Sequence, residues 1–350
     1  MTIEKILREW DGRFCISRYD ESTGAFFTIA VHAISGGSAT GGTRAMQYTG
    51  FDAAVEDATR LAGAMTLKAA IAGLPMGGGK SVIALPAPRN EIPADQWRRI
   101  LEIHAENLAT LGGTYWTGPD VGTASADMDV VHAAGGSVFG CSEAGGGSGS
   151  SAPETAHGVH VAIHAAGREA GIDDLAGTRV LVQGLGAVGY AVAELVAADG
   201  AHVVATDVDA TRCDRARAEL GAEIIGVDEA LSTPSDVFVP CATGGLIDDD
   251  TAATIQTRVI AGAANNLLAH ESAADTLAAR GIVLAPDFVA NGGGLIHLVG
   301  REVLDWTAER VSTHVAGIGD TLHEVFDLAR AENLSTQRAA RQLATERLPA

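Results

Sequence analysis

Hydrophobic and polar positions divide the first half of the chain into short strands and longer helices. Residues 24–34 carry β-branched and aromatic residues between glycines, which predicts a strand. Residues 51–73 are rich in Ala, Leu and Met, with Asp52 as the expected N-cap, and they predict a helix. We expect a Gly-rich turn over 76–80 and a strand over 81–85 directly after it.

The pattern continues with a helix over 95–111, a short strand over 113–116 and a loop over 117–123. Residues 144–153, with the sequence AGGGSGSSAP, read as a linker, because glycine and serine give flexibility and proline ends the segment. A domain boundary is therefore expected near residue 148.

Beyond the linker the pattern changes to alternating strands and helices. Strands are expected at 179–183, 202–207, 236–240, 259–261 and 282–285. This alternation predicts a parallel, doubly wound sheet, and hence an α/β protein with two domains. Residues 304–350 are expected to be helical and to pack back toward the first domain.

Composition and charge narrow the classes of partner. The net charge of −20 disfavours nucleic acid and anionic membranes, since both would repel the chain. No apolar run is long enough for a transmembrane helix, and the N-terminal residues lack a signal-peptide pattern. The four cysteines lie far apart without a CxxC pair, which argues against a disulfide framework and suits a reducing cytosol. We expect a cytoplasmic protein.

The basic residues are almost all arginine. Of the 24 basic residues only Lys5, Lys68 and Lys80 are lysines, and a lysine, unlike an arginine, can lose its proton when it is desolvated. Lys80 ends the motif LPMGGGK, where small residues leave room for a substrate and lower the pKa of the amine by desolvation. Asp120, in the loop GPDVGT, could exchange protons with a substrate nitrogen or water. Ordinary surface cations and a turn acid are the alternatives.

A dinucleotide-binding pattern follows the linker. In RVLVQGLGAVG a predicted strand leads into glycines with G-x-G-x-x-G spacing, and a helix follows. The first glycine permits a tight turn, the second lets a pyrophosphate approach the backbone, and the third lets helix and strand pack closely. The helix start then offers free N–H groups to the phosphates. The residues expected at the cofactor here are Gly184, Gly186, Ala187, Val188 and Gly189.

The choice of nucleotide is expected to rest on Asp207, which ends the second strand of this unit at the spacing of a ribose-binding acid. A carboxylate there repels a 2′-phosphate, and Asp209 adds a second negative charge, so the pattern favours NAD over NADP. Arg212 could answer a phosphate, and a simple turn acid is the alternative interpretation of Asp207.

Three histidines, His157, His160 and His164, fall near one face of the helix after the linker. The sequence shows no companion cluster of acids or cysteines, so we interpret them as helix-surface residues and predict no metal site.

Four segments carry a resemblance to a known family. LPMGGGKSVI, YWTGPDVGT, VLVQGLGAVG and VIAGAANNLL, in this order and at these separations, closely resemble the glutamate/leucine/phenylalanine/valine dehydrogenase family. The similarity runs through nearly the whole chain and is greatest to the phenylalanine-specific members. Ser81 and Leu85 depart from residues common in the family, and neither is expected to touch the catalytic lysine directly.

The resemblance implies a fold and a partner set. Residues 1–148 would form an α/β substrate and oligomerisation domain, and 149–303 a Rossmann-type NAD-binding domain. The protein would be a homo-oligomer that takes NAD, an amino acid, its 2-oxo acid and ammonium, and no metal. The reaction would be reversible oxidative deamination of a hydrophobic L-amino acid.

The resemblance also implies roles for individual residues. Lys80 would act as general base and Asp120 would move protons at the amino group. The α-carboxylate would be held by Lys68 and the backbone around Gly41 and Gly42. Residues expected near the nicotinamide are Asn265, which would also reach the substrate carboxylate, and Ser151 and Thr155.

The substrate side chain is expected near Gly118 and Leu295. A glycine at 118 is taken to leave volume for a benzyl group, which predicts L-phenylalanine as substrate and phenylpyruvate as product. Leucine or valine is the alternative within the family. A 2-hydroxy-acid dehydrogenase, expected to use a His/acid pair with an Arg clamp, and a non-catalytic NAD-binding sensor are the alternatives outside it.

Overall fold

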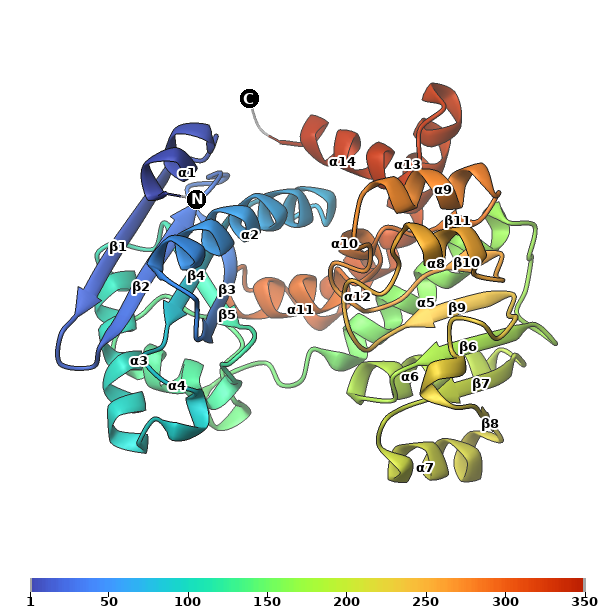
Figure 1. Ribbon diagram of the computed structural model, residues 1–350, viewed down its shortest axis with the longest axis horizontal. Helices are drawn as coiled ribbons and strands as arrows, with labels where there is room; N and C mark the ends of the chain where they lie inside the picture. The colour runs from blue at the N-terminus through green and yellow to red at the C-terminus, as the bar shows by residue number, and fades with distance from the viewer. Residues whose placement is uncertain (1, 349–350) are drawn as a thin grey trace. The chain divides into compact units, whose positions relative to one another are not determined.

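The computed structural model describes residues 2–348, which divide into two compact units (Figure 1). The first unit contains the described chain up to Gly149, the segment Leu298–Trp306 and the described residues after Glu346. The second contains Ser150–His297 and Thr307–Glu346. None of the helices between residues 2 and 348 combines the length and apolar character that a membrane crossing requires.

A five-stranded mixed sheet forms the centre of the first unit. Its strands are β1 (Phe14–Asp20), β2 (Ala25–Val31), β3 (Ala39–Met46), β4 (Gly77–Ala84) and β5 (Tyr115–Pro119). They lie in the order β1-β2-β4-β3-β5, with β3 parallel to both β4 and β5 and the other pairs antiparallel. β5 runs further than the strand predicted over 113–116, so it includes Gly118, which the sequence placed in a loop.

Helices cover both faces of this sheet. They are α1 (Ile3–Glu9), α2 (Phe51–Ile71), α3 (Ala94–Ala109) and α4 (Ser125–Ala133), with 3₁₀ turns at Arg89–Glu91 and Glu143–Gly145. Successive strand residues point to opposite faces, and accordingly Val82 packs with the alanines of α2 whereas Ile83 packs with the apolar side of α3. The N-cap of α2 is Gly50, so the prediction of Asp52 as the cap is wrong, and Asp52 lies in the first turn.

Residues 77–80 of the predicted turn over 76–80 belong to strand β4, so the prediction of a turn there is wrong. The glycines of this strand are needed for close packing and not for a reversal of the chain. A Cβ on Gly78 would lie 2.0 Å from the backbone nitrogen of Thr66 in α2, and one on Gly79 would lie 2.7 Å from the ring of Tyr115. The two glycines before Lys80 therefore let helix α2 and the ring of Tyr115 contact the backbone of the strand directly.

A six-stranded parallel sheet forms the centre of the second unit, which confirms the predicted doubly wound α/β domain. Its strands are β6 (Arg179–Gln183), β7 (His202–Thr206), β8 (Glu223–Ile224), β9 (Val237–Pro240), β10 (Val259–Ile260) and β11 (Val283–Leu284). The order is β11-β10-β9-β6-β7-β8. The chain winds outward from β6 to β8 and then returns to place β9 beside β6. In such sheets ligands bind at this switch point, outside the carboxyl ends of the strands.

Ten helices and one 3₁₀ turn complete the described part of the second unit and its connection to the first. They are α5 (Ala152–Glu169), α6 (Ala187–Ala198), α7 (Ala210–Leu220), the 3₁₀ turn Val227–Glu229, α8 (Asp249–Thr254), α9 (Ser272–Ala279), α10 (Asp287–Ala290), α11 (Gly293–Glu302), α12 (Ala308–Ala316), α13 (Ile318–Glu332) and α14 (Thr336–Glu346).

The last three helices, α12–α14, belong to the second unit, and the packing of residues 304–350 toward the first domain stays a prediction. Helices α12 and α13 pack against α5, and α14 packs against α9 and β11. Small residues allow the close contact of α13 with α5, since a Cβ on Gly158 would lie 2.8 Å from Cδ1 of Ile318. Of the described residues after 303, those at 304–306 and those after Glu346 belong to the first unit.

Candidate active site

A buried ion pair, Lys80 with Asp120, lies at the sheet of the first unit. Nζ of Lys80 is 2.7 Å from Oδ2 of Asp120, and the side chains are 6% and 24% exposed. Strand β4 supplies the lysine, and the aspartate directly follows β5. The sequence predicted both residues as candidates, but not that they contact each other.

Gly42 makes this contact possible. Strand β3 lies between β4 and β5, so the two side chains must meet across it. A Cβ on Gly42 would lie 3.0 Å from Cβ of Asp120 and 3.2 Å from Nζ of Lys80. Neighbouring Gly41 is packed as closely, since its Cβ would lie 1.9 Å from the carbonyl oxygen of Gly79. Gly42 therefore lies at the pair, where a larger residue would crowd it, whereas Gly41 faces the opposite side of β3, toward Tyr115.

Arg44 is a member of the site that the sequence reasoning missed. Its Nε lies 3.1 Å from Oδ2 of Asp120, and its Nη1 lies 3.0 Å from Oδ2 of Asp57 on α2. The hydroxyl of Tyr48 donates a 2.8 Å hydrogen bond to the same Asp57 oxygen. The available signal was strand alternation, because Arg44 is two residues after Gly42 and therefore shares its face of β3.

The electrostatics of the pair suit proton transfer. Burial lowers the pKa of Lys80 below its ordinary value, although the ion pair with Asp120 opposes this effect. Burial acts to raise the pKa of Asp120, but the charges of Lys80 and Arg44 outweigh it, so this pKa lies below its usual range. Asp120 is therefore ionised at neutral pH, while Lys80 releases its proton more readily than an exposed lysine does.

A buried polar network fixes the three strands from the other face of the sheet. The Thr43 hydroxyl lies 2.8 Å from those of Ser81 and Thr117 and 3.0 Å from Nε2 of His104. Burial lowers the pKa of His104 to about 4, so the ring is neutral at neutral pH. Ser81, a departure from the family pattern, is thus held by hydrogen bonds that tie β3 to β4 and β5.

Lys68 lies near the end of α2 and is half-buried. Helix α2 packs against β4, so Lys68 lies on the helix that covers the strand carrying Lys80.

The expected empty volume at Gly118 is filled by Phe139. A Cβ on Gly118 would lie 2.2 Å from Cε2 of this ring, and both residues are buried. The interpretation of Gly118 as space for a substrate side chain is therefore wrong. The glycine is explained by packing between β5 and the segment that follows α4.

We expect Gly118→Ala to destabilise the fold by about 1–3 kcal/mol, because the new methyl group must displace a buried aromatic ring. Denaturant unfolding measures this effect. Gly50→Ala is the matched control, since a Cβ there meets no atom within 4 Å. Equal stability of Gly118→Ala and the wild type would contradict the packing explanation.

In the second unit, the turn from β6 to α6 has the geometry that a bound pyrophosphate requires. Gly184 has φ +93°, which favours glycine, and a Cβ on Gly189 would lie 1.9 Å from the carbonyl oxygen of Gly184. A Cβ on Gly186 would meet no atom within 4 Å, so the backbone is open to a ligand there. Ala187 and Val188 form the first turn of α6, whose N–H groups suit phosphate.

Asp207 directly follows β7, beside this turn. Its carboxylate accepts hydrogen bonds from the backbone nitrogens of Leu185 (2.6 Å) and Asp209 (2.8 Å). Burial acts to raise its pKa, but these hydrogen bonds outweigh it and the pKa lies below the usual range. Arg212 already faces Asp207 and Asp209, at 3.6 and 3.5 Å. A cavity of about 390 Å³ over this turn is lined by Leu185, Gly186, Ala187 and Arg212, among others.

Asn265 is exposed and follows β10. Its side chain is oriented by a hydrogen bond from Asn291. Nδ2 of Asn291 donates a 2.9 Å hydrogen bond to Oδ1 of Asn265 and a 3.2 Å bond to the carbonyl oxygen of Ala263. Asn291 is buried, and the sequence reasoning did not identify it.

Ser151 and Thr155 lie at the start of α5, against α11. The Thr155 hydroxyl donates to the carbonyl oxygen of Ser151 at 2.8 Å. A Cβ on Gly294 would lie 2.5 Å from this hydroxyl and 3.4 Å from that of Ser151. Leu295, half-buried, is the next residue of α11, so these three predicted residues belong to one neighbourhood of the second unit.

Comparison with known proteins covers nearly the whole chain. The model of the Glutamate/Leucine/Phenylalanine/Valine dehydrogenase family matches residues 146–215 and 206–350, and that of its dimerisation domain matches 17–134. Leucine dehydrogenase of Thermoactinomyces intermedius is 38% identical over 99% of this chain and 94% of its own. Phenylalanine dehydrogenase of Bacillus thermotolerans is 35% identical over 95% and 87%. The crystal structure of L-tryptophan dehydrogenase from Nostoc punctiforme superposes with a TM-score of 0.83, at 32% identity, over 99% of this chain and 98% of its own.

The fold and the site thus define an NAD-dependent oxidoreductase that acts on an amino acid. The chain belongs to the glutamate/leucine/phenylalanine/valine dehydrogenase family, as its motifs predicted. The similar proteins differ in the amino acid in their names, and the leucine enzyme is slightly more identical to this chain than the phenylalanine enzyme.

Proposed function

We propose that the protein catalyses the reversible oxidative deamination of a hydrophobic L-amino acid, with L-phenylalanine as the preferred substrate and phenylpyruvate and ammonia as products. The observation that supports the chemistry is the buried contact of Lys80 with Asp120, beside Gly42 of β3. A hydrophobic side chain is favoured because relatives named for leucine, phenylalanine and tryptophan cover nearly the whole chain.

In this proposal, different residues of the first unit bind the substrate and transfer protons. Lys68 and the backbone around Gly41 and Gly42 hold the α-carboxylate of the substrate. Bound NAD⁺ would supply the acceptor for the hydride from Cα, and loss of this hydride would convert the substrate amine into an iminium. Lys80 takes a proton from the water that attacks the imino carbon, and Asp120 exchanges a proton with the departing nitrogen. Exclusion of bulk water strengthens each of these interactions.

The residues of the second unit serve the cofactor in this proposal. Gly184, Gly186 and Gly189, with the first turn of α6, hold the pyrophosphate, and Asp207 binds the adenosine ribose. Asn265 reaches the nicotinamide and the substrate carboxylate, with Ser151 and Thr155 on the nicotinamide side. We further propose that Leu295 contacts the substrate side chain and that the first domain joins copies of the chain into a homo-oligomer, as the dimerisation-domain match suggests.

Leucine is the second candidate substrate, because Phe139 fills the volume that was expected to receive a benzyl group. The deciding measurement is kcat/KM across phenylalanine, tryptophan, leucine, valine and glutamate. We expect phenylalanine to lead, with the aliphatic substrates lower by roughly 10- to 200-fold, since small differences in an apolar pocket are worth only about 1–3 kcal/mol. A higher value for leucine or valine would overturn the substrate proposal and leave the chemistry intact.

We expect Lys68→Ala to raise KM for the amino acid and the oxo acid by roughly 10- to 100-fold, because the carboxylate loses a charged hydrogen-bond donor worth about 1.5–3 kcal/mol. Lys68→Arg should not restore KM, since a planar guanidinium does not replace a compact ammonium. Steady-state kinetics measure both, with KM for NAD⁺ as internal control. Lys5→Ala, at an exposed lysine of α1, is the matched variant and should behave as the wild type. An unchanged substrate KM in Lys68→Ala would show that the carboxylate is bound elsewhere.

A further inference from the structure

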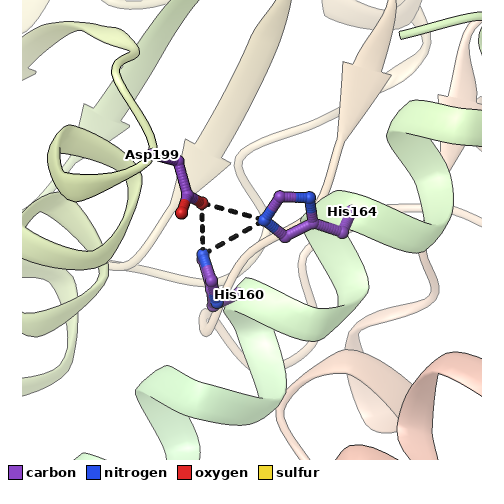
Figure 2. Close-up of side chains that lie close together, drawn as sticks. All are labelled: His160, His164 and Asp199. Atoms are coloured by element: carbon purple, nitrogen blue, oxygen red, sulfur yellow. Dashed lines mark hydrogen bonds and ion pairs between the residues drawn. The ribbon is translucent and has the colours of Figure 1, made fainter. Parts of the chain in front are cut away.

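Two histidines and an aspartate of the second unit converge on one point, away from the residues assigned to the cofactor. His160 and His164 are four residues apart on α5 and therefore lie on one face of the helix. Asp199 is the residue at which α6 ends. Figure 2 shows the two rings and the carboxylate turned toward each other, and their ligand atoms all lie within 4.8 Å of one another.

The distances are short for all three pairs of atoms. Nε2 of His160 lies 2.6 Å from Oδ2 of Asp199, and Nε2 of His164 lies 2.9 Å from the same oxygen. The two Nε2 atoms are 3.2 Å apart. The three side chains are 18%, 27% and 31% exposed, so an ion from solvent can reach them.

Hydrogen bonds alone satisfy only two of these three contacts. If both Nε2 atoms carry a proton, each donates to the same aspartate oxygen, and the two nitrogens then lie 3.2 Å apart with no acceptor between them. If only one carries a proton, the other nitrogen has no proton to donate to the carboxylate. A cation bound by both nitrogens and by the carboxylate oxygen would satisfy all three groups at once.

The size and chemistry of the cluster suit zinc. In a tetrahedral zinc site with bonds of about 2.0–2.1 Å, neighbouring ligand atoms lie about 3.3 Å apart. To reach this spacing the two nitrogen atoms need almost no movement, His164 must move from Asp199 by about 0.4 Å, and His160 must move from Asp199 by about 0.7 Å. Imidazole and carboxylate are both common zinc ligands.

We propose that His160, His164 and Asp199 form a binding site for a divalent transition-metal ion, with Zn²⁺ as the preferred occupant and water in the fourth position. The ion links α5 to the C-terminal end of α6. The N-terminal end of the same helix follows the turn with Gly184 and Gly186. The prediction of no metal site missed this possibility because the acid comes 35 residues after His164 and meets it only when α5 packs against α6.

The test uses the full chain, stripped of metal with a chelator and titrated with Zn²⁺ alone by calorimetry. We expect one tightly bound equivalent per chain, and a melting temperature that rises when zinc is added. His160→Ala and His164→Ala should each weaken this binding at least about 10-fold and remove the rise in melting temperature, since each deletes one of three ligands. His157→Ala, on the same helix but outside the cluster, is the matched control and should bind as the wild type.

Asp199→Asn covers the case in which a histidine variant fails to fold, because it keeps the side-chain shape while removing the charge. NAD⁺ binding reports folding in every variant, and turnover is not the readout, so the result is independent of the proposed substrate. The proposal would be overturned if the wild-type protein did not bind zinc. An affinity that is unchanged in folded Asp199→Asn or in the folded histidine variants would overturn it as well.

Discussion

Replacement of Lys80 by alanine is expected to lower kcat by about 10²- to 10⁴-fold, the usual contribution of a positioned acid–base group. The ammonium group is buried and lies 2.7 Å from Asp120. Strand β4 contains no second lysine that could replace it as a base. Steady-state kinetics in both directions measure the loss. NAD⁺ binding should change little, because the dinucleotide turn belongs to the second unit.

The variant should remain folded, because Arg44 stays in contact with Asp120 and the carboxylate is not left without a cation. Circular dichroism and the denaturation midpoint check this point. A folded Lys80→Ala protein with near-normal turnover would contradict the assignment of the general base.

Asp120→Asn is expected to lower kcat to a similar extent, about 10²- to 10⁴-fold, because an amide cannot exchange the proton at the substrate nitrogen. The variant should also move the pH profile. The carboxylate of Asp120 raises the pKa of Lys80 against the effect of burial, so its removal lowers that pKa further. Lys80 acts as a base only when it is deprotonated, and activity therefore rises as pH passes through this pKa.

The rising limb of kcat/KM should consequently lie at lower pH in Asp120→Asn than in the wild type. Asp95→Asn, at an exposed acid in the first turn of α3, is the matched control and should leave both rate and profile unchanged. A rising limb that stays in place, or that moves to higher pH, would show that Asp120 does not tune the lysine.

Features encoded in a short segment were predictable from the sequence. Strand β6, the turn with Gly184, Gly186 and Gly189, and helix α6 follow one another within 20 residues, and their bounds agree with the pattern. The alternation of β-strands and helices likewise predicted the parallel sheet. In each case the local pattern and the glycine chemistry point to the same structure.

Features that depend on which elements become neighbours were not predictable in the same way. The contact of Lys80 with Asp120 requires β3 to lie between β4 and β5. No single segment of the sequence determines this strand order. Arg44 enters the site for the same reason. Phe139 fills the space at Gly118 from a segment about 20 residues away, so a glycine in the sequence gave no measure of free volume.

The central claim is that the chain interconverts an amino acid and a 2-oxo acid with NAD. It is tested most directly by NADH oxidation with phenylpyruvate, in the presence and absence of ammonium. We expect oxidation only when ammonium is present, with one L-phenylalanine formed for each NADH consumed. NADH oxidation without ammonium would indicate reduction of the oxo acid to a hydroxy acid, and no oxidation with any 2-oxo acid would indicate a non-catalytic NAD-binding protein; either result would contradict the claim.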